Sequence, residues 1–225
     1  MKKEDYVLIK LKLNYKNIKR NMVNIMNDIQ KVMNVHNLYD EMKRTDYMQN
    51  NTIYLDDEID REVINALSRQ LKKLGDKQLG LSTQDRTPIK LIISSCGGEV
   101  YSTFYFCDLM EYYISRGVEI HTYVTSYAYS GAFKIAICGS RRYGYKRTKY
   151  MCHQQNWFEY GYTTRQDAKR KYEKSEELFN ELVDLITSKT KITRDMLEDY
   201  SNRNDDWYMG STDALEMSVI DEIII

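Results

Sequence analysis

The chain has 225 residues, enough for one large domain or for a domain with a small appendage. It carries 33 Lys and Arg residues against 33 Asp and Glu residues, so its formal net charge is zero. This balance gives no electrostatic reason to expect binding to nucleic acid or to an anionic membrane. No apolar run approaches the roughly 20 residues that span a bilayer, and the charged start at residues 1–5 is not followed by an apolar signal core. We therefore expect a cytoplasmic protein.

The first 48 residues show no clear alternation of strand, turn and helix patterns. Residues 7–13 alternate in part and could form a strand. Within residues 18–33, apolar side chains recur at a helical spacing, at Met22, Ile25, Ile29 and Met33. We interpret residues 1–48 as an N-terminal extension that is partly helical. A packing or oligomer-contact role is favoured over a catalytic one.

Residues 49–225 form the expected main domain, in which strand and helix patterns alternate. The expected helix after the capping residues 56–60 has apolar positions from Val63 to Leu74 and ends at Gly75. Such alternation predicts right-handed crossovers and a mainly parallel sheet. The expected strands are 52–55, 89–93 and 118–125, and the next expected helix is about 100–115.

A long helix is expected from residue 163 to about residue 189, with Thr164 and Asp167 spaced like a capping pair. Its apolar positions form a narrow seam that could pack on its own sheet or project against a neighbouring subunit. The members of the seam are Ala168, Tyr172, Ser175, Phe179, Leu182 and Ile186. Further short helices are expected at 192–200 and 212–217, before a terminal segment at 219–225.

The four cysteines form no C-x-x-C pair and no spacing typical of a zinc site. Their surroundings predict buried free thiols, and we expect neither a metal nor a cofactor. Cys152 is next to His153 in sequence, but adjacent side chains on a strand point to opposite faces. A Cys–His catalytic pair is therefore disfavoured. The cysteines are Cys96, Cys107, Cys138 and Cys152.

Ser130 lies between a strand-like run and a short apolar helix, and a glycine follows it directly. In parallel sheets, active sites form beyond the carboxyl ends of strands, where Ser130 and the turn at residues 97–98 are both expected. Ser130, His153 and Asp206, in this order, are the parts of an acyl-transfer site. A serine at this position alone could equally be a helix cap.

From about residue 52 to the C-terminus, the chain resembles the Clp peptidase family of ClpP-like serine proteases. Five motifs occur in the family's order: IYLDDEI at 53–59, IISSCGG at 92–98, AYSGAF at 128–133, MCHQ at 151–154 and NDDWYM at 204–209, the last followed by an Asp-Ala pair. The resemblance implies an α/β fold of the ClpP/crotonase type. This fold has repeated ββα and βαβ units, a mainly parallel sheet and a long projecting helix.

The chain departs from the family pattern near these motifs. Cys96 and Gln155 each replace a proline, and one residue is missing after Ser130, as in the related signal-peptide peptidases. The glycine-rich strand after the histidine is replaced by an aromatic segment at 156–162. This strand lines the peptide groove and the subunit contacts in the family, so cleavage preference and ring contacts do not carry over.

The resemblance implies a role for each site residue. Ser130 would be the nucleophile, His153 the general base, and Asp206 the acid that orients the histidine, with Asp205 as the alternative acid. The backbone N–H groups of Gly98 and Gly131 would stabilise the oxyanion. Lys134 lies four positions after Ser130. Although signal-peptide peptidases use a lysine as base, Lys134 is interpreted as a solvated lysine.

The implied function is a serine endopeptidase that hydrolyses unfolded polypeptides inside a chamber of stacked homo-oligomeric rings. An ATPase unfoldase as partner is left open, and neither nucleic acid nor a membrane is expected as a partner. Two alternatives remain: a catalytically impaired ClpP-like assembly subunit, or a crotonase-like acyl-CoA enzyme. The second needs no serine–histidine pair, so the downstream motifs disfavour it.

Overall fold

The computed structural model describes residues 22, 25–26, 30–31, 50–153, 164–203 and 205–225. The chain divides into two compact units, Met1–Tyr47 and Met48–Ile225. In the first unit the few described residues are helical, and Met22, Ile25 and Met26 among them are exposed. The strand expected at 7–13 and most of the helix expected at 18–33 lie outside the described residues. The domain boundary at residue 48 stays a prediction.

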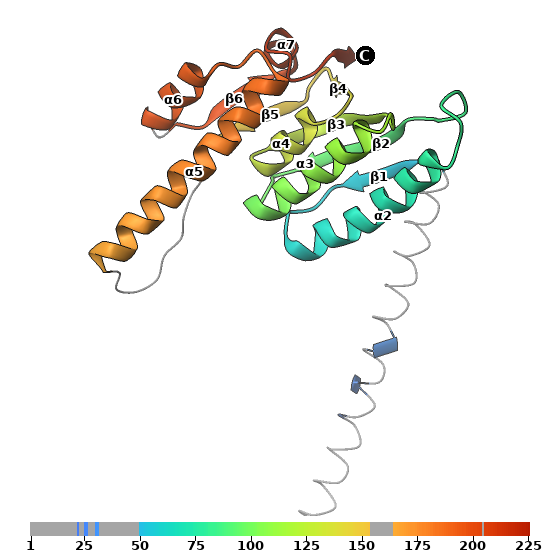
Figure 1. The fold of residues 1–225 in the computed structure, drawn as a ribbon, viewed down its shortest axis with the longest axis horizontal. Helices are drawn as coiled ribbons and strands as arrows, with labels where there is room; N and C mark the ends of the chain where they lie inside the picture. The colour runs from blue at the N-terminus through green and yellow to red at the C-terminus, as the bar shows by residue number, and fades with distance from the viewer. Residues whose placement is uncertain (1–21, 23–24, 27–29, 32–49, 154–163, 204) are drawn as a thin grey trace, which may run out of the picture. The chain divides into compact units, whose positions relative to one another are not determined.

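The described part of the second unit is built on a seven-stranded sheet with the order β1-β2-β3-β4-β7, in which β5 joins β3 and β6 joins β5 (Figure 1). All pairs are parallel except β5 with β6, which is antiparallel. The mainly parallel α/β fold is therefore as expected. The strands are β1 Thr52–Leu55, β2 Ile89–Ser95, β3 Ile120–Tyr129, β4 Arg141–Tyr145, β5 Lys149–Cys152, β6 Trp207–Gly210 and β7 Glu222–Ile224.

Helices α2, α3 and α4 lie side by side over β1, β2 and β3 (Figure 1). The short helix α4 also contacts α5, so it is enclosed by the sheet and by two longer helices. All seven of its residues are buried. The helices are α2 Arg61–Leu79, α3 Val100–Ile114, α4 Gly131–Ile137, α5 Arg165–Lys189, α6 Arg194–Arg203 and α7 Ser211–Glu216.

Helix α5, orange in Figure 1, extends away from the sheet. Thr164 caps it by accepting a hydrogen bond from the Asp167 N–H, as its sequence predicts. Its buried residues, Leu178, Leu182, Val183 and Ile186, all lie in its C-terminal half and pack on its own domain. The N-terminal half of the apolar seam is exposed, with Tyr172 67% exposed. The seam thus serves the protein's own core in one half and leaves the other half unburied.

The described structure differs from the expectation in element boundaries, in two strands and at one cysteine. The strand expected at 118–125 runs to Tyr129, directly up to Ser130, and β4 and β6 were not expected. Cys96 is exposed, whereas the other three cysteines are buried free thiols as expected. Its exposure follows from its place in the turn beyond the end of β2. Helix α2 does not stop at Gly75 but continues to Leu79.

Gly75 allows close packing inside α2 rather than ending the helix. A Cβ atom added to Gly75 would lie 2.4 Å from the ring of Tyr113 in α3. The Tyr113 hydroxyl donates a hydrogen bond of 2.8 Å to Asp76, next to Gly75. The glycine therefore lets a large aromatic ring lie against the helix backbone, an approach that a periodicity argument cannot detect.

We predict that Gly75→Ala destabilises the protein by about 1–3 kcal/mol, because overpacking against the Tyr113 ring outweighs the gain in helix propensity. The matched control is Gly80→Ala at the end of the same helix, where φ is −74° and the nearest atoms to an added Cβ lie at 3.5 Å. This control should be neutral or slightly stabilising. Urea denaturation measures both; equal stability of the two variants would contradict the packing argument.

Candidate active site

Ser130 occupies a sharp turn between β3 and α4. Its φ is 51°, a left-handed conformation that is uncommon for a residue other than glycine. The turn is held by a 2.9 Å hydrogen bond from the Ser130 N–H to the Met151 carbonyl in β5. Although Ser130 is at the N-cap position, its side chain makes no capping hydrogen bond. The simple helix-cap interpretation therefore does not describe this serine, and such strain is typical of functional sites.

His153 lies within hydrogen-bond distance of this serine. His153 follows β5, which runs parallel to the end of β3. The two strands therefore end at the same edge of the sheet. The distance from Ser130 Oγ to His153 Nε2 is 2.8 Å. This is the geometry in which an imidazole accepts a proton from a hydroxyl group.

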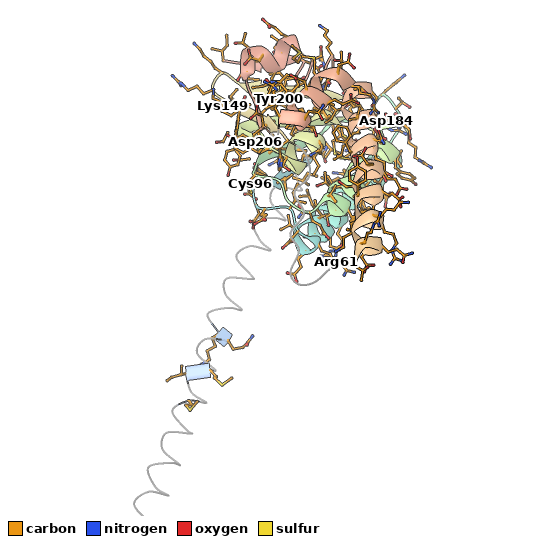
Figure 2. All side chains as sticks on the ribbon, turned by 90° about the vertical axis from the view of Figure 1, so that its left-hand side faces the viewer. Arg61, Cys96, Lys149, Asp184, Tyr200 and Asp206 are labelled. Atoms are coloured by element: carbon orange, nitrogen blue, oxygen red, sulfur yellow. The ribbon has the colours of Figure 1, made fainter. Side chains whose placement is uncertain are left out.

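Asp206, labelled in Figure 2, directly precedes the antiparallel strand β6. It lies on the Nδ1 side of the His153 ring, whereas Ser130 lies on the Nε2 side. The distance from Asp206 Oδ1 to His153 Nδ1 is 3.8 Å, longer than a hydrogen bond, and the Asp206 side chain is 49% exposed. Asp205 instead lies 3.8 Å from Arg203. Of the two candidate acids, the geometry therefore brings Asp206 to His153.

The glycine turn after β2 lies beside the serine. Ile59 forms a parallel bridge to Gly98, donating to the Gly97 carbonyl at 2.7 Å and accepting from the Glu99 N–H at 2.7 Å. In such a bridge the N–H of the central residue points away from the partner strand. A Cβ atom added to Gly131 would lie 3.4 Å from the Gly98 nitrogen. The backbone N–H of Gly98 is therefore near the start of α4, next to Ser130.

Lys134 is buried, and the expectation of a solvated lysine is wrong. Its side chain is only 4% exposed because α4 is enclosed on every side. The signal was present in the sequence: apart from Lys134, the residues of α4 are apolar all round the helix, which is typical of a buried helix. Burial lowers the pKa of the Lys134 ammonium.

The pKa of His153 is lowered, mainly by burial and next by the positive charge of Lys134. The carboxylate of Asp206 opposes both effects by favouring the charged imidazolium. The net result is a histidine that stays neutral, and able to accept a proton, to a lower pH than usual.

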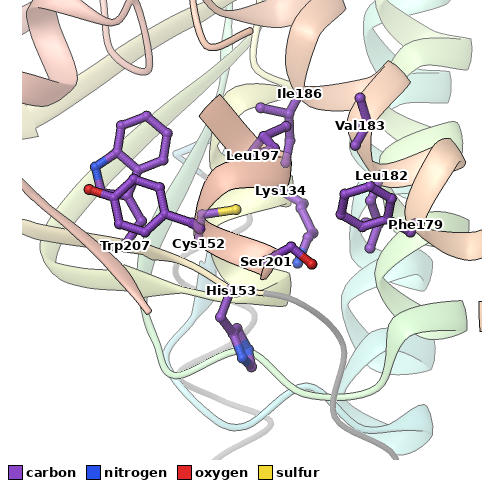
Figure 3. A pocket seen from close by; sticks show the side chains of 11 residues that line it. Lys134, Cys152, His153, Phe179, Leu182, Val183, Ile186, Leu197, Ser201 and Trp207 are labelled. Carbon is purple, nitrogen blue, oxygen red and sulfur yellow. The ribbon is translucent and has the colours of Figure 1, made fainter. Parts of the chain in front are cut away.

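A pocket opens beside His153, between α4, β5, α5 and α6 (Figure 3). Its water-accessible volume is about 30 Å³, room for about two water molecules. The walls are mostly apolar, with Phe179, Leu182 and Trp207 among them, and Lys134 and His153 are its charged or titratable nitrogen groups. The buried lysine and the histidine of the serine–histidine pair therefore line the same pocket.

Within the described ranges, no cluster of three His, Cys, Asp or Glu side chains could hold a metal ion. A search for membrane spans among the described helices found none that is both long and apolar enough. The fold and the site define an α/β protein with a serine–histidine pair at the carboxyl ends of parallel strands, beside a glycine turn.

The family model for the Clp protease family matches residues 31–225, so the chain belongs to this family of ClpP-like peptidases. The match begins at residue 31 and therefore includes residues 31–48, which the sequence interpretation assigned to the extension. A comparison with curated proteins gave no match.

We predict that His153 titrates below the ordinary histidine pKa of about 6.5. Asp206→Asn should lower this pKa further, because it removes the carboxylate that favours the imidazolium. The unfolded chain, in which the histidine pKa is about 6.5, binds the proton more readily than the folded protein. The contribution of neutral His153 to the free energy of unfolding is therefore fully present above about pH 6.5, and it is lost as the pH falls below this value.

NMR of histidine-labelled protein measures this pKa directly. The sequence has three histidines, and His153→Gln assigns the signal. A midpoint at or above about 6.5 would contradict the effect of burial and of Lys134.

Proposed function

We propose that this protein is a serine endopeptidase that hydrolyses peptide bonds of unfolded polypeptides. Ser130 is the nucleophile, His153 the general base and Asp206 the orienting acid. The observation that carries the proposal is the 2.8 Å contact between Ser130 Oγ and His153 Nε2 at a strained turn. A serine hydroxyl is a weak nucleophile unless a neighbouring base accepts its proton.

The proposed reaction has two halves. Ser130 Oγ bonds to the substrate carbonyl carbon while His153 Nε2 takes the hydroxyl proton, and His153 then gives this proton to the departing amine as the peptide C–N bond breaks. Water attacks the acyl-enzyme in the same way, with His153 taking its proton and returning it to Ser130. No metal or cofactor is needed for these steps.

The backbone N–H groups of Gly98 and Gly131 are the proposed oxyanion donors. Gly98 is supported by the bridge to Ile59, which turns its N–H toward the start of α4. Gly131 is supported by its position directly after the nucleophile, as the first residue of a helix. One such donor contributes about 3 kcal/mol to transition-state stabilisation in comparable sites.

The 3.8 Å distance between Asp206 and His153 supports a second candidate, a catalytically impaired assembly subunit. A half-exposed carboxylate at this distance orients the imidazole only weakly. Catalytic hydrogen bonds are, however, often long without substrate and shorten in the reacting complex. We favour the active enzyme because the serine–histidine contact, which a subunit kept for assembly does not need, is short.

We further propose that the protein works as a cytoplasmic homo-oligomer of stacked rings that enclose a chamber. Membership of the Clp protease family supports this assembly. The exposed N-terminal half of α5 supports it as well, together with Tyr101, Tyr105 and Tyr112, which leave α3 with exposed aromatic rings. Such exposed apolar groups are typical of contact surfaces.

A serine-reactive fluorophosphonate should label Ser130, and peptide mapping by mass spectrometry identifies the adduct. We expect labelling to disappear in Ser130→Ala and to fall at least about 100-fold in rate in His153→Ala, the range of general-base catalysis. Ser126→Ala is the matched control, because this serine is exposed on the same strand and should have no effect. Absence of labelling at Ser130 in a correctly assembled oligomer would refute the proposal.

Light scattering of the native protein should give the mass of a large homo-oligomer rather than of one chain. We expect Tyr172→Asp to weaken assembly without unfolding the protein, because this side chain is 67% exposed in the single chain. Circular dichroism checks the fold of the variant. A monomeric native protein that still labels at Ser130 would refute the ring and leave the chemistry standing.

A further inference from the structure

Lys134 is a buried lysine whose side chain lines the pocket beside His153 (Figure 3). It is only 4% exposed, and every other residue of α4 is apolar or glycine. A methionine or leucine would fill the same position without the cost of burying an ammonium group. The lysine therefore needs a partner, or a reason to tolerate burial without one.

No counter-charge for Lys134 is found in the described part of the chain. No carboxylate there forms an ion pair with it. The thiols of Cys152 and Cys107 are the groups that favour its charged form, but burial raises the pKa of Cys152 and the pKa of Cys107 is raised as well, chiefly by its contact with Cys138. Both thiols are therefore protonated at neutral pH, and neither neutralises the ammonium group.

The pocket has the composition expected of a site for an acidic side chain. Apolar walls that include Phe179 and Trp207 suit methylene groups, and Tyr200 and Ser201 also line it. Lys134 supplies the one positive group suited to a carboxylate. The position beside His153 means that a side chain entering the pocket belongs to a residue close to the bond that Ser130 would attack.

We propose that this pocket selects an Asp or Glu side chain of the polypeptide substrate, next to the scissile bond, by pairing its carboxylate with Lys134. The inference rests on the proposed function, because it takes Ser130 and His153 as the reacting pair. Lys134 is then a specificity-determining residue that touches the substrate. The carboxylate displaces the water that the pocket can hold.

The bound carboxylate also assists the chemistry. Lys134 disfavours the imidazolium form of His153, which must form when Ser130 gives up its proton. A carboxylate on Lys134 cancels this repulsion. An acidic side chain therefore improves both binding and proton transfer, whereas a neutral side chain of the same shape does neither.

Peptidyl diphenyl phosphonates test the proposal. In this reaction Ser130 Oγ bonds to phosphorus, phenoxide leaves, and His153 accepts the serine proton. Four probes would differ only in the side chain next to phosphorus: those of Glu, Gln, Asp and Asn. We expect the acidic probes to label Ser130 at least about tenfold faster than their amides. This is the rate difference expected from one charge-assisted hydrogen bond.

In Lys134→Met, the acidic probes should label Ser130 at about the same rate as their amides. The control Lys169→Met changes an exposed lysine of α5 and should keep the faster labelling by the acidic probes. Equal labelling by acidic and amide probes in the unmodified protein would overturn the proposal without any variant having to fold. An equal loss for all four probes in Lys134→Met would also overturn it, because Lys134 would then serve the fold alone.

Failure of the proposed function would give a different labelling result from failure of the acidic pocket. If Ser130 were not a nucleophile, neither the four probes nor the small fluorophosphonate would label it. Labelling by the fluorophosphonate without any preference among the four probes contradicts the acidic pocket only.

Discussion

The site depends on the way strand β3 changes partners along its length. Its first half pairs with β4, from His121 to Val124, and its end pairs with β5, from Tyr127 to Tyr129. The hydrogen bond from Ser130 N–H to the β5 backbone continues this second pairing into the turn. One strand end therefore sets the strained backbone of Ser130 and also the position of His153. The short serine–histidine contact follows from main-chain pairing.

The electrostatics of the site follow from the enclosure of α4. A helix packed between the sheet, α3 and α5 has no face in water, so its single charged residue, Lys134, is buried with it. The lysine and the histidine then share a small pocket of low polarity, in which charges act on each other more strongly than at a surface. This arrangement makes the charge state of the pocket part of the proposed chemistry.

The failed expectations have physical causes. Gly75 resembles a helix stop, but close packing of the Tyr113 ring requires a glycine at that point. The short strand β6 has no periodicity of its own and exists because β5 offers it an edge. Lys134 was expected in water by residue type, although the apolar residues around it indicated a buried helix. For Gly75 and β6, a long-range contact outweighed a local preference, whereas for Lys134 the local pattern outweighed the usual exposure of the residue type.

The sequence by itself determined most of the helices, the mainly parallel sheet, and Ser130 and His153 as candidate site residues, but it missed β4 and β6. The helices and the sheet follow from periodicity and turn residues, which are local signals, and the site residues follow from the order of the motifs along the chain. Only the tertiary structure decided that Asp206 rather than Asp205 faces His153, because the antiparallel register of β6 on β5 sets this choice. It also decided that Lys134 lies beside His153, since the burial of a helix depends on the elements packed around it.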